Sequence, residues 1–240
     1  NIIMMPANRG LRVFAPLFLF YNKLYHRMIH YVVIGGWLGS FLDEHKWLVR
    51  LLKKFDAIYV ESDMMKSALQ RRGFENAVVM YNFKELEPLA ESDIEYPKSE
   101  PYKLCTFSRV MKEKGIEDAI NAVESVNAHF GRTVYTLDIF GQVDVEYKER
   151  FSQLEKSFPD YISYGGAIEA NKSVETLKSY FALLFPTYYK GEGFAGTLID
   201  AMSAGVPVIA SDWKYNPEFV VPGKTGVIRK NCNAERLAEE

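Results

Sequence analysis

The sequence predicts an α/β protein with parallel β-sheets, organised as two domains. Short apolar segments alternate along the chain with segments whose apolar residues recur at helical spacing, the order that parallel strands and crossover helices require. A proline-rich, acidic segment at residues 84–101 interrupts this alternation. The 240 residues, 48% of them apolar and 25% charged, suffice for two small domains that each bury a core.

Nine segments have the length and apolar content of strands: residues 2–5, 31–35, 57–61, 77–81, 103–107, 134–140, 161–164, 182–186 and 207–210. Helical spacing is clearest in two sets of residues, Trp47, Leu48, Leu51, Leu52 and Phe55, and Ile116, Ala119, Ile120 and Val123. We therefore expect sheets with crossover helices on both faces.

Residues 84–101 contain three prolines and six acidic residues in eighteen positions, without an apolar period, and we interpret them as a linker. The alternative is a long surface loop within one domain. The linker predicts an N-terminal domain at residues 1–83 and a C-terminal domain at 102–240. The chain starts within a strand pattern and stops within a helical one, 233–240, so we expect an incomplete first domain and missing final helices.

Charge and cysteine content exclude several classes of protein. The formal net charge of −2 gives no basic surplus for a nucleic-acid partner. Cys105 and Cys232 are far apart, which argues against a disulfide scaffold and for buried thiols in a reducing cytoplasm.

The longest apolar run, 13–21, is too short to span a bilayer. Residues 10–30 combine aromatic and basic residues, as an interfacial helix in peripheral contact with a membrane would. We favour a buried crossover helix, because such helices are apolar nearly all round.

Ligands of open parallel sheets bind beyond the carboxyl ends of the strands, and three segments of the second domain follow strands. Arg109 and Lys114 bracket a tight loop that ends before the helix from Ile116, so both cations can converge on one anion. The alternative is a solvated charged turn. The glycine pair Gly165-Gly166, followed by Ala167, would let a flat ring approach the backbone, or be a simple turn.

The third segment, 190–200, contains Gly191, Gly193 and Gly196 before a helix. Glycines that can adopt positive φ and the amides of a helix N-terminus together predict a phosphate cradle. Glu192 lies in the loop, and Asp200 about one turn into the helix, where a carboxylate can accept hydrogen bonds from a ribose diol.

The run from Phe185-Pro186 through Gly191-Glu192-Gly193-Phe194-Ala195-Gly196 to Asp212 resembles the donor-site signature of retaining glycosyltransferases of family 4. Ser108-Arg109 through Lys114-Gly115, Pro217-Glu218 with 223–226, and Tyr81-Asn82 resemble flanking motifs of the same family. The resemblance covers residues 57–232 and implies a GT-B fold of two Rossmann-like, doubly wound domains. It also implies a nucleotide-sugar donor, UDP- or GDP-linked, with no cofactor.

The resemblance assigns roles by position. Glu192 would contact the donor sugar and Asp200, here one methylene shorter than the usual Glu, the ribose. Arg109 and Lys114 would hold the pyrophosphate, and the 164–168 turn would receive the base. The cradle would comprise Gly193, Phe194, Ala195, Gly196, Thr197 and Leu198.

The first 83 residues match the family only in part. The strand at 31–35 ends in Gly35-Gly36-Trp37, where many relatives carry a histidine, and neither His30 nor His45 fills that place. The acceptor-facing candidates are Asn8 with Arg9, and Gly36 with Trp37, each with a structural turn as its alternative.

These features predict a cytoplasmic, retaining glycosyltransferase that moves a sugar to a saccharide or lipid-linked acceptor in capsule or surface-polysaccharide assembly. No Asp-x-Asp metal motif occurs, so we expect Arg109, Lys114 and helix amides to stabilise the leaving group without a metal. The alternatives are a nucleotide-sugar epimerase and an inactive sugar-nucleotide-binding module. A nicotinamide dehydrogenase is a weaker alternative.

Overall fold

The protein is described by a computed structural model that covers residues 1–94 and 96–230. It consists of two compact units. The first unit comprises Asn1–Asn82 together with Lys190–Ala195. The second comprises Phe83–Tyr189 and the described residues from Gly196 onward.

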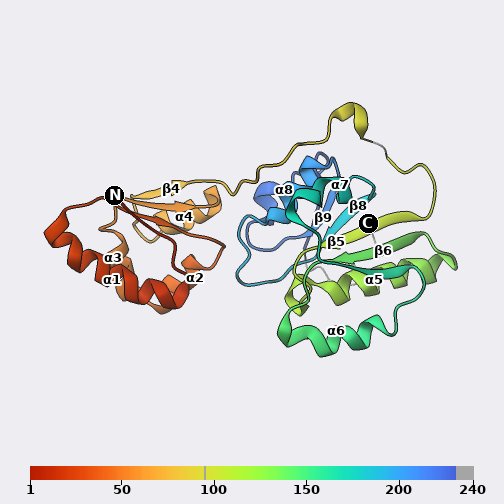
Figure 1. The fold of residues 1–240 in the computed structure, drawn as a ribbon, viewed down its shortest axis with the longest axis horizontal. Helices are drawn as coiled ribbons and strands as arrows, with labels where there is room; N and C mark the ends of the chain where they lie inside the picture. The colour runs from red at the N-terminus through yellow and green to blue at the C-terminus, as the bar shows by residue number, and fades with distance from the viewer. Residues whose placement is uncertain (95, 231–240) are drawn as a thin grey trace. The chain divides into compact units, whose positions relative to one another are not determined.

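The first unit is a four-stranded parallel sheet in the order β1 (Ile2–Met4), β2 (Ile29–Val32), β3 (Ala57–Val60) and β4 (Ala77–Val79). Its helices are α1 (Asn8–Tyr25), α2 (Leu38–Glu44), α3 (Lys46–Leu52) and α4 (Asp63–Gln70), and α1 lies beside α3 (Figure 1). Strands and helices alternate along the chain, as expected from the sequence.

Helix α1 differs from the expectation of a buried crossover helix. Its buried residues are Leu11 and Ala15, one turn apart on the helix. Large apolar side chains on its other faces are exposed: Val13, Phe14, Leu17, Phe20, Tyr21, Leu24 and Tyr25. The prediction of burial is wrong because a single narrow stripe of this helix packs on its unit. Within the described residues, no helix is long and apolar enough to cross a membrane.

The second unit contains a six-stranded parallel sheet in the order β10-β9-β8-β5-β6-β7. The strands are β5 (Tyr102–Phe107), β6 (Tyr135–Phe140), β7 (Ile162–Gly166), β8 (Ala182–Phe185), β9 (Val208–Ser211) and β10 (Gly226–Arg229). The chain builds β5, β6 and β7 outward in one direction and then returns, so that β8 pairs with the other edge of β5. This reversal makes the β5–β8 junction the topological switch point of the sheet, where ligands of such sheets bind.

The sheet of the second unit is covered on both faces (Figure 1). Helices α5 (Ile116–Phe130) and α6 (Lys148–Glu155) lie on one face, and α7 (Ser173–Leu177) and α8 (Gly196–Ser203) on the other; α9 (Asn216–Phe219) follows β9. The predicted apolar face of α5 is confirmed, because Ile116, Ala119, Ile120 and Val123 are all buried in the core.

Most of the predicted strands are confirmed within a residue or two, but β10 was not predicted. Its four residues follow a turn that contains Gly223 and pair along one side with β9. In the segment 84–101, leaving out residue 95, the structure contains one short 3₁₀ turn, Glu91–Asp93, and no α-helix or strand. Cys105 is fully buried, and burial raises the pKa of its thiol. Cys232 and the predicted helical pattern at 233–240 lie outside the described residues.

Candidate functional site

A cavity of about 470 Å³ opens in the second unit beyond the carboxyl ends of β5 and β6 and beside the start of α8. It is lined by Lys84, Phe107, Ser108, Phe140, Gly141, Gln142, Ala167, Ile168, Gly196, Thr197 and Asp200. Among the residues that we expected at the site, it brings together Ala167, Gly196, Thr197 and Asp200. Its position at the carboxyl edge of the sheet fits the general rule for such folds.

Backbone groups form one wall of the cavity, and Gly141 makes that wall possible. Its φ is 136°, and a Cβ at this position would lie 1.7 Å from the carbonyl oxygen of Ser108. Any other residue would force the ends of β5 and β6 apart. Close approach also permits the hydrogen bond from the Gly141 N–H to the Gly166 carbonyl, at 2.8 Å.

The start of α8 forms a second wall. Gly196 and Thr197 line the cavity, and the amides of a first helical turn have no partner within their own helix, so they carry a partial positive charge. The Thr197 hydroxyl donates to the Phe107 carbonyl, which anchors the helix start to the end of β5. Leu198 is fully buried in the core instead of lining the cavity.

Asp200 provides the cavity with a buried carboxylate. The residue is 1% exposed, its Oδ2 lies 2.6 Å from the Nζ of Lys84, and its Oδ1 lies 2.8 Å from the Oγ of Ser173. The predicted ribose-binding residue therefore already has a cation and a hydroxyl as partners.

The turn after β7 contributes to the cavity through Ala167 and Ile168. A Cβ on Gly165 would lie 2.2 Å from Cε1 of Phe140, so the flat ring that this glycine admits is a phenylalanine of the protein. Gly165 and Gly166 are not among the lining residues.

The two predicted cations lie on the loop after β5 but outside the cavity lining. Arg109 is largely exposed, and its Nη1 lies 3.7 Å from Oδ2 of Asp144. Lys114 places its Nζ 5.4 Å from the ring centroid of Phe185 and 5.3 Å from that of Tyr189, within the range of cation–π attraction. Gly115, with φ 72°, closes this loop against the carbonyl of Pro186.

The loop at 190–195 belongs to the first unit, where it contacts the segments after β2 and β3. The Phe194 N–H donates to Oε2 of Glu61 at 3.0 Å, and the Gly36 N–H donates to the Gly191 carbonyl at 3.1 Å. Glu192 is buried, with 5% exposed. Burial raises the pKa of Glu61, and the nearby charge of Glu192 adds to the rise. Hydrogen bonds from backbone N–H groups, chiefly that of Phe194, oppose it.

The expected positive φ at the loop glycines is not found. None of Gly191, Gly193 and Gly196 has a left-handed conformation. Space explains two of them: a Cβ on Gly193 would lie 2.2 Å from Oε2 of Glu61, and one on Gly196 would lie 2.9 Å from Cε of Lys84. Ala195 lies in the same loop, between these two glycines.

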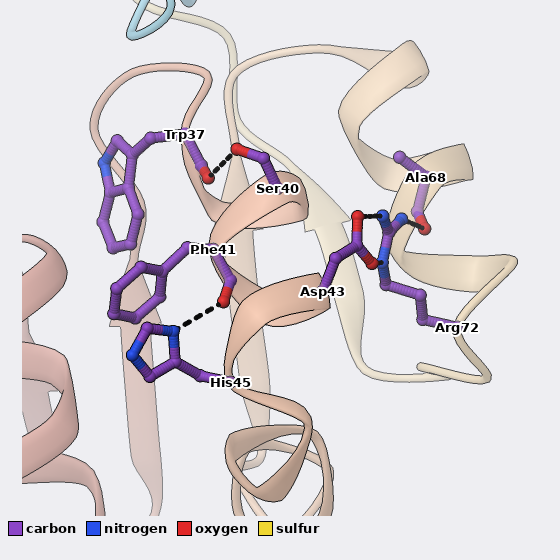
Figure 2. A network of polar contacts seen from close by, with 7 residues as sticks. All are labelled: Trp37, Ser40, Phe41, Asp43, His45, Ala68 and Arg72. Carbon is purple, nitrogen blue, oxygen red and sulfur yellow. Dashed lines mark hydrogen bonds and ion pairs between the residues drawn. The ribbon is translucent and has the colours of Figure 1, made fainter.

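The acceptor-facing candidates lie in the first unit. Asn8 and Arg9 are exposed at the start of α1, and Gly36 is buried. Trp37 precedes α2, and its ring meets the Phe41 ring edge-on, with the ring centroids 5.3 Å apart. The Phe41 ring in turn stacks on His45, with centroids 4.2 Å apart. Figure 2 shows how these three side chains follow one another.

A paired charge fixes the far side of α2. Arg72 donates to both carboxylate oxygens of Asp43, at 3.0 and 2.7 Å, and to the Ala68 carbonyl (Figure 2). This hydrogen bonding lowers the pKa of Asp43. The pair ties α2 to the end of α4, so the segment that carries Trp37 leads into an anchored helix.

Three polar residues at these sites were not predicted from the sequence: Lys84, Ser173 and Glu61. Lys84 lies in the segment interpreted as a linker, and Ser173 opens a short helix that was not predicted. Glu61 is the last residue of the strand predicted at 57–61, and a charged residue at the carboxyl end of a strand is the one signal of a site that the sequence offers here. Among residues 1–94 and 96–230, no group of three or more His, Cys, Asp or Glu side chains could hold a metal ion.

Comparisons with known proteins address the family. The sequence profile of the family described as "Glycosyl transferases group 1" matches residues 90–240. A UDP-N-acetylglucosamine–peptide N-acetylglucosaminyltransferase GtfA subunit of Streptococcus gordonii is 30% identical over 177 residues, which cover 70% of this chain and 34% of that protein. The amylovoran biosynthesis glycosyltransferase AmsK of Erwinia amylovora is 25% identical over 147 residues, or 58% of this chain and 35% of that one. The chain thus spans about a third of the length of these relatives.

Solved structures address the fold. The crystal structure of Anabaena Alr3699/HepE in complex with UDP superimposes with a TM-score of 0.77 at 17% identity, over 99% of this chain and 67% of that one. This likeness confirms the expected GT-B fold. With the family profile matching well over half of its residues, the chain belongs to the glycosyl transferases of group 1.

Proposed function

We propose that the protein transfers a sugar, with retention of configuration, from a UDP-sugar to a saccharide or lipid-linked acceptor in surface-polysaccharide assembly. The observation that carries the proposal is the cavity of about 470 Å³ that joins Asp200 to the start of α8 at the switch point of the sheet. UDP as the nucleotide is supported by the names of the Streptococcus gordonii relative and of the HepE complex. The polysaccharide role is supported by the amylovoran glycosyltransferase.

In this proposal the cavity receives the nucleotide. Asp200 accepts hydrogen bonds from the ribose, Ala167 and Ile168 face the base, and the amides of Gly196 and Thr197 meet the diphosphate. Negative charge builds up on the diphosphate as the sugar leaves, and helix-terminal amides stabilise such charge without reorganising.

The charged side chains complete the proposed chemistry. Lys114 and Arg109 stabilise the leaving diphosphate in place of a metal ion, and Glu192 contacts the donor sugar. Lys114 lies within cation–π distance of two aromatic rings, which restricts its conformations and favours a preorganised cation.

The exposed side chains of α1 favour an acceptor presented at a membrane. Phe20, Leu24 and Tyr25 are 63%, 72% and 64% exposed, and Lys23 and Arg27 lie beside them in the sequence. Apolar anchors next to basic residues suit the inner face of an anionic membrane. Flotation with phosphatidylglycerol vesicles tests this, because Phe20→Ser with Leu24→Ser should abolish binding; flotation unchanged by both substitutions would contradict it.

Turnover assays test the function itself. The full-length protein is incubated with UDP- and GDP-sugars, with and without acceptor, and the product anomer is assigned by NMR. We expect UDP release that depends on acceptor and an α-linked product from an α-linked donor. Donor consumption without acceptor would identify an epimerase, UDP binding without turnover an inactive binding module, and a β-linked product an inverting enzyme.

A further inference from the structure

Lys84, Asp200 and Ser173 form a polar cluster in the wall of the cavity. Lys84 lies just after β4, Ser173 begins α7, and Asp200 lies within α8, so three separate parts of the chain converge. The Nζ of Lys84 is 2.6 Å from Oδ2 of Asp200, and the Oγ of Ser173 is 2.8 Å from Oδ1. Ser173 and Asp200 are each 1% exposed.

The partners of Asp200 compensate the burial of its carboxylate. A carboxylate removed from water is strongly destabilising unless a cation or hydrogen-bond donors compensate it. Lys84 supplies the cation, and its side chain remains 31% exposed. The Ser173 hydroxyl also lies 3.0 Å from the Ala170 carbonyl, but it has one proton, and the charged carboxylate is the stronger acceptor.

Two features of the fold place Lys84 near the first turn of α8. A Cβ on Gly196 would lie 2.9 Å from Cε of Lys84 and 3.4 Å from its Nζ, so the glycine at the start of α8 lets the lysine pass. Downstream of Lys84, the Leu89 N–H donates to the Ser203 carbonyl at 2.7 Å. The segment is therefore held along α8, and Lys84 is held near its first turn.

The carboxylate keeps capacity for a ligand. An ionised carboxylate has about four lone-pair sites, and Lys84 and Ser173 use one on each oxygen. Two sites are left, the number that a ribose diol requires.

We propose that Lys84 and Ser173 are positioning residues, which orient the Asp200 carboxylate for the ribose hydroxyls of the nucleotide. The inference rests on the proposed function, because it assumes that a nucleotide occupies the cavity. It assigns a role in nucleotide binding to Lys84, which lies in the 84–101 segment. Lys84 acts through Asp200, so its influence on binding should disappear whenever Asp200 or the ribose hydroxyls are removed.

The test is isothermal titration of the full-length protein with UDP and with 2′,3′-dideoxy-UDP. Lys84→Met should weaken UDP binding about tenfold to a hundredfold, the worth of a hydrogen bond to a charged group. It should change the affinity for the dideoxy analogue by less than about threefold. Ser173→Ala should act in the same direction with a smaller loss. Lys98→Met is the matched control, since Lys98 is an exposed lysine of the same segment, and it should change neither affinity.

A second pair of variants guards against misfolding, because Lys84→Met leaves a buried carboxylate without its cation. In the Asp200→Asn background the charge is gone, and adding Lys84→Met should alter UDP affinity by less than about twofold. A further tenfold loss there would overturn the inference and indicate direct contact of Lys84 with the nucleotide.

The outcomes separate the inference from the proposed function. If the wild-type protein binds UDP and Lys84→Met binds it equally well, the inference alone is overturned. Equal losses for UDP and the dideoxy analogue would do the same. Absence of UDP binding by the wild-type protein would overturn the proposed function, and the inference with it.

Discussion

Gly115 offers a sharp test of how the structure positions the Lys114 loop. Its φ of 72° is left-handed, and a Cβ there would lie 2.3 Å from the Pro186 carbonyl oxygen. Gly115→Ala therefore incurs two costs, about 1–2 kcal/mol for the left-handed conformation and about 1–3 kcal/mol for the overlap. We expect a loss of about 2–5 kcal/mol in the free energy of unfolding.

Gly131, at the other end of α5, is the matched control. Its φ is 64°, but no atom lies within 4 Å of the position its Cβ would occupy. Gly131→Ala should thus lose about 1–2 kcal/mol, the conformational cost alone. Urea denaturation of both variants measures the difference, and the donor KM should rise in Gly115→Ala only, because Lys114 is displaced from its aromatic neighbours. Equal destabilisation of the two variants would refute the proposed docking of the loop.

Three further outcomes are expected. Asp200→Asn should weaken UDP binding by about 1–3 kcal/mol, whereas Glu192→Gln should mainly lower transfer; calorimetry and rate assays on both variants distinguish these effects, and equal binding losses would remove the distinction. Lys114→Ala should lower kcat about 10²–10³-fold while chelators leave the wild-type rate unchanged, and chelator inhibition reversed by magnesium would falsify the metal-free mechanism. Hydrogen bonds from Arg150 lower the pKa of Glu117 more than partial burial of the side chain raises it. This carboxylate therefore stabilises the fold above its unfolded pKa of roughly 4. That contribution is lost as the pH falls through the lower pKa of the folded state. Glu117→Gln should therefore lower the free energy of unfolding at pH 7, and a difference from wild type that persists at pH 2 in denaturation curves would contradict the assignment.

Local pattern predicted most of the fold, because the alternation of strands and helices is written in the spacing of apolar residues. The apolar face of α5 and the strands β5, β6 and β8 follow from that spacing. Strand β10 could not be predicted in this way, because its four residues after a turn are too few to show a spacing of apolar residues. The exposure of α1 is a tertiary property, since its aromatic residues have the same sequence whether or not another element covers them.

The candidate site divides in the same way. Motif spacing placed Asp200, Gly196 and Thr197 at one cavity. It did not reveal that Lys84, 116 positions before Asp200, is the cation beside that carboxylate. The linker composition that marks residues 84–101 as irregular carries no information on which of its side chains return to the sheet. The role expected of glycine in the 190–196 loop was likewise conformational, whereas two of the three glycines there make room for other side chains.

A crystal structure of the protein with UDP tests the central claim most directly. The account predicts density for the nucleotide in the cavity of the second unit, with the ribose hydroxyls within hydrogen-bond distance of Asp200, the base beside Ala167 and Ile168, and the diphosphate at the amides of Gly196 and Thr197. UDP bound elsewhere, or bound there with Asp200 facing the base instead of the ribose, would contradict it.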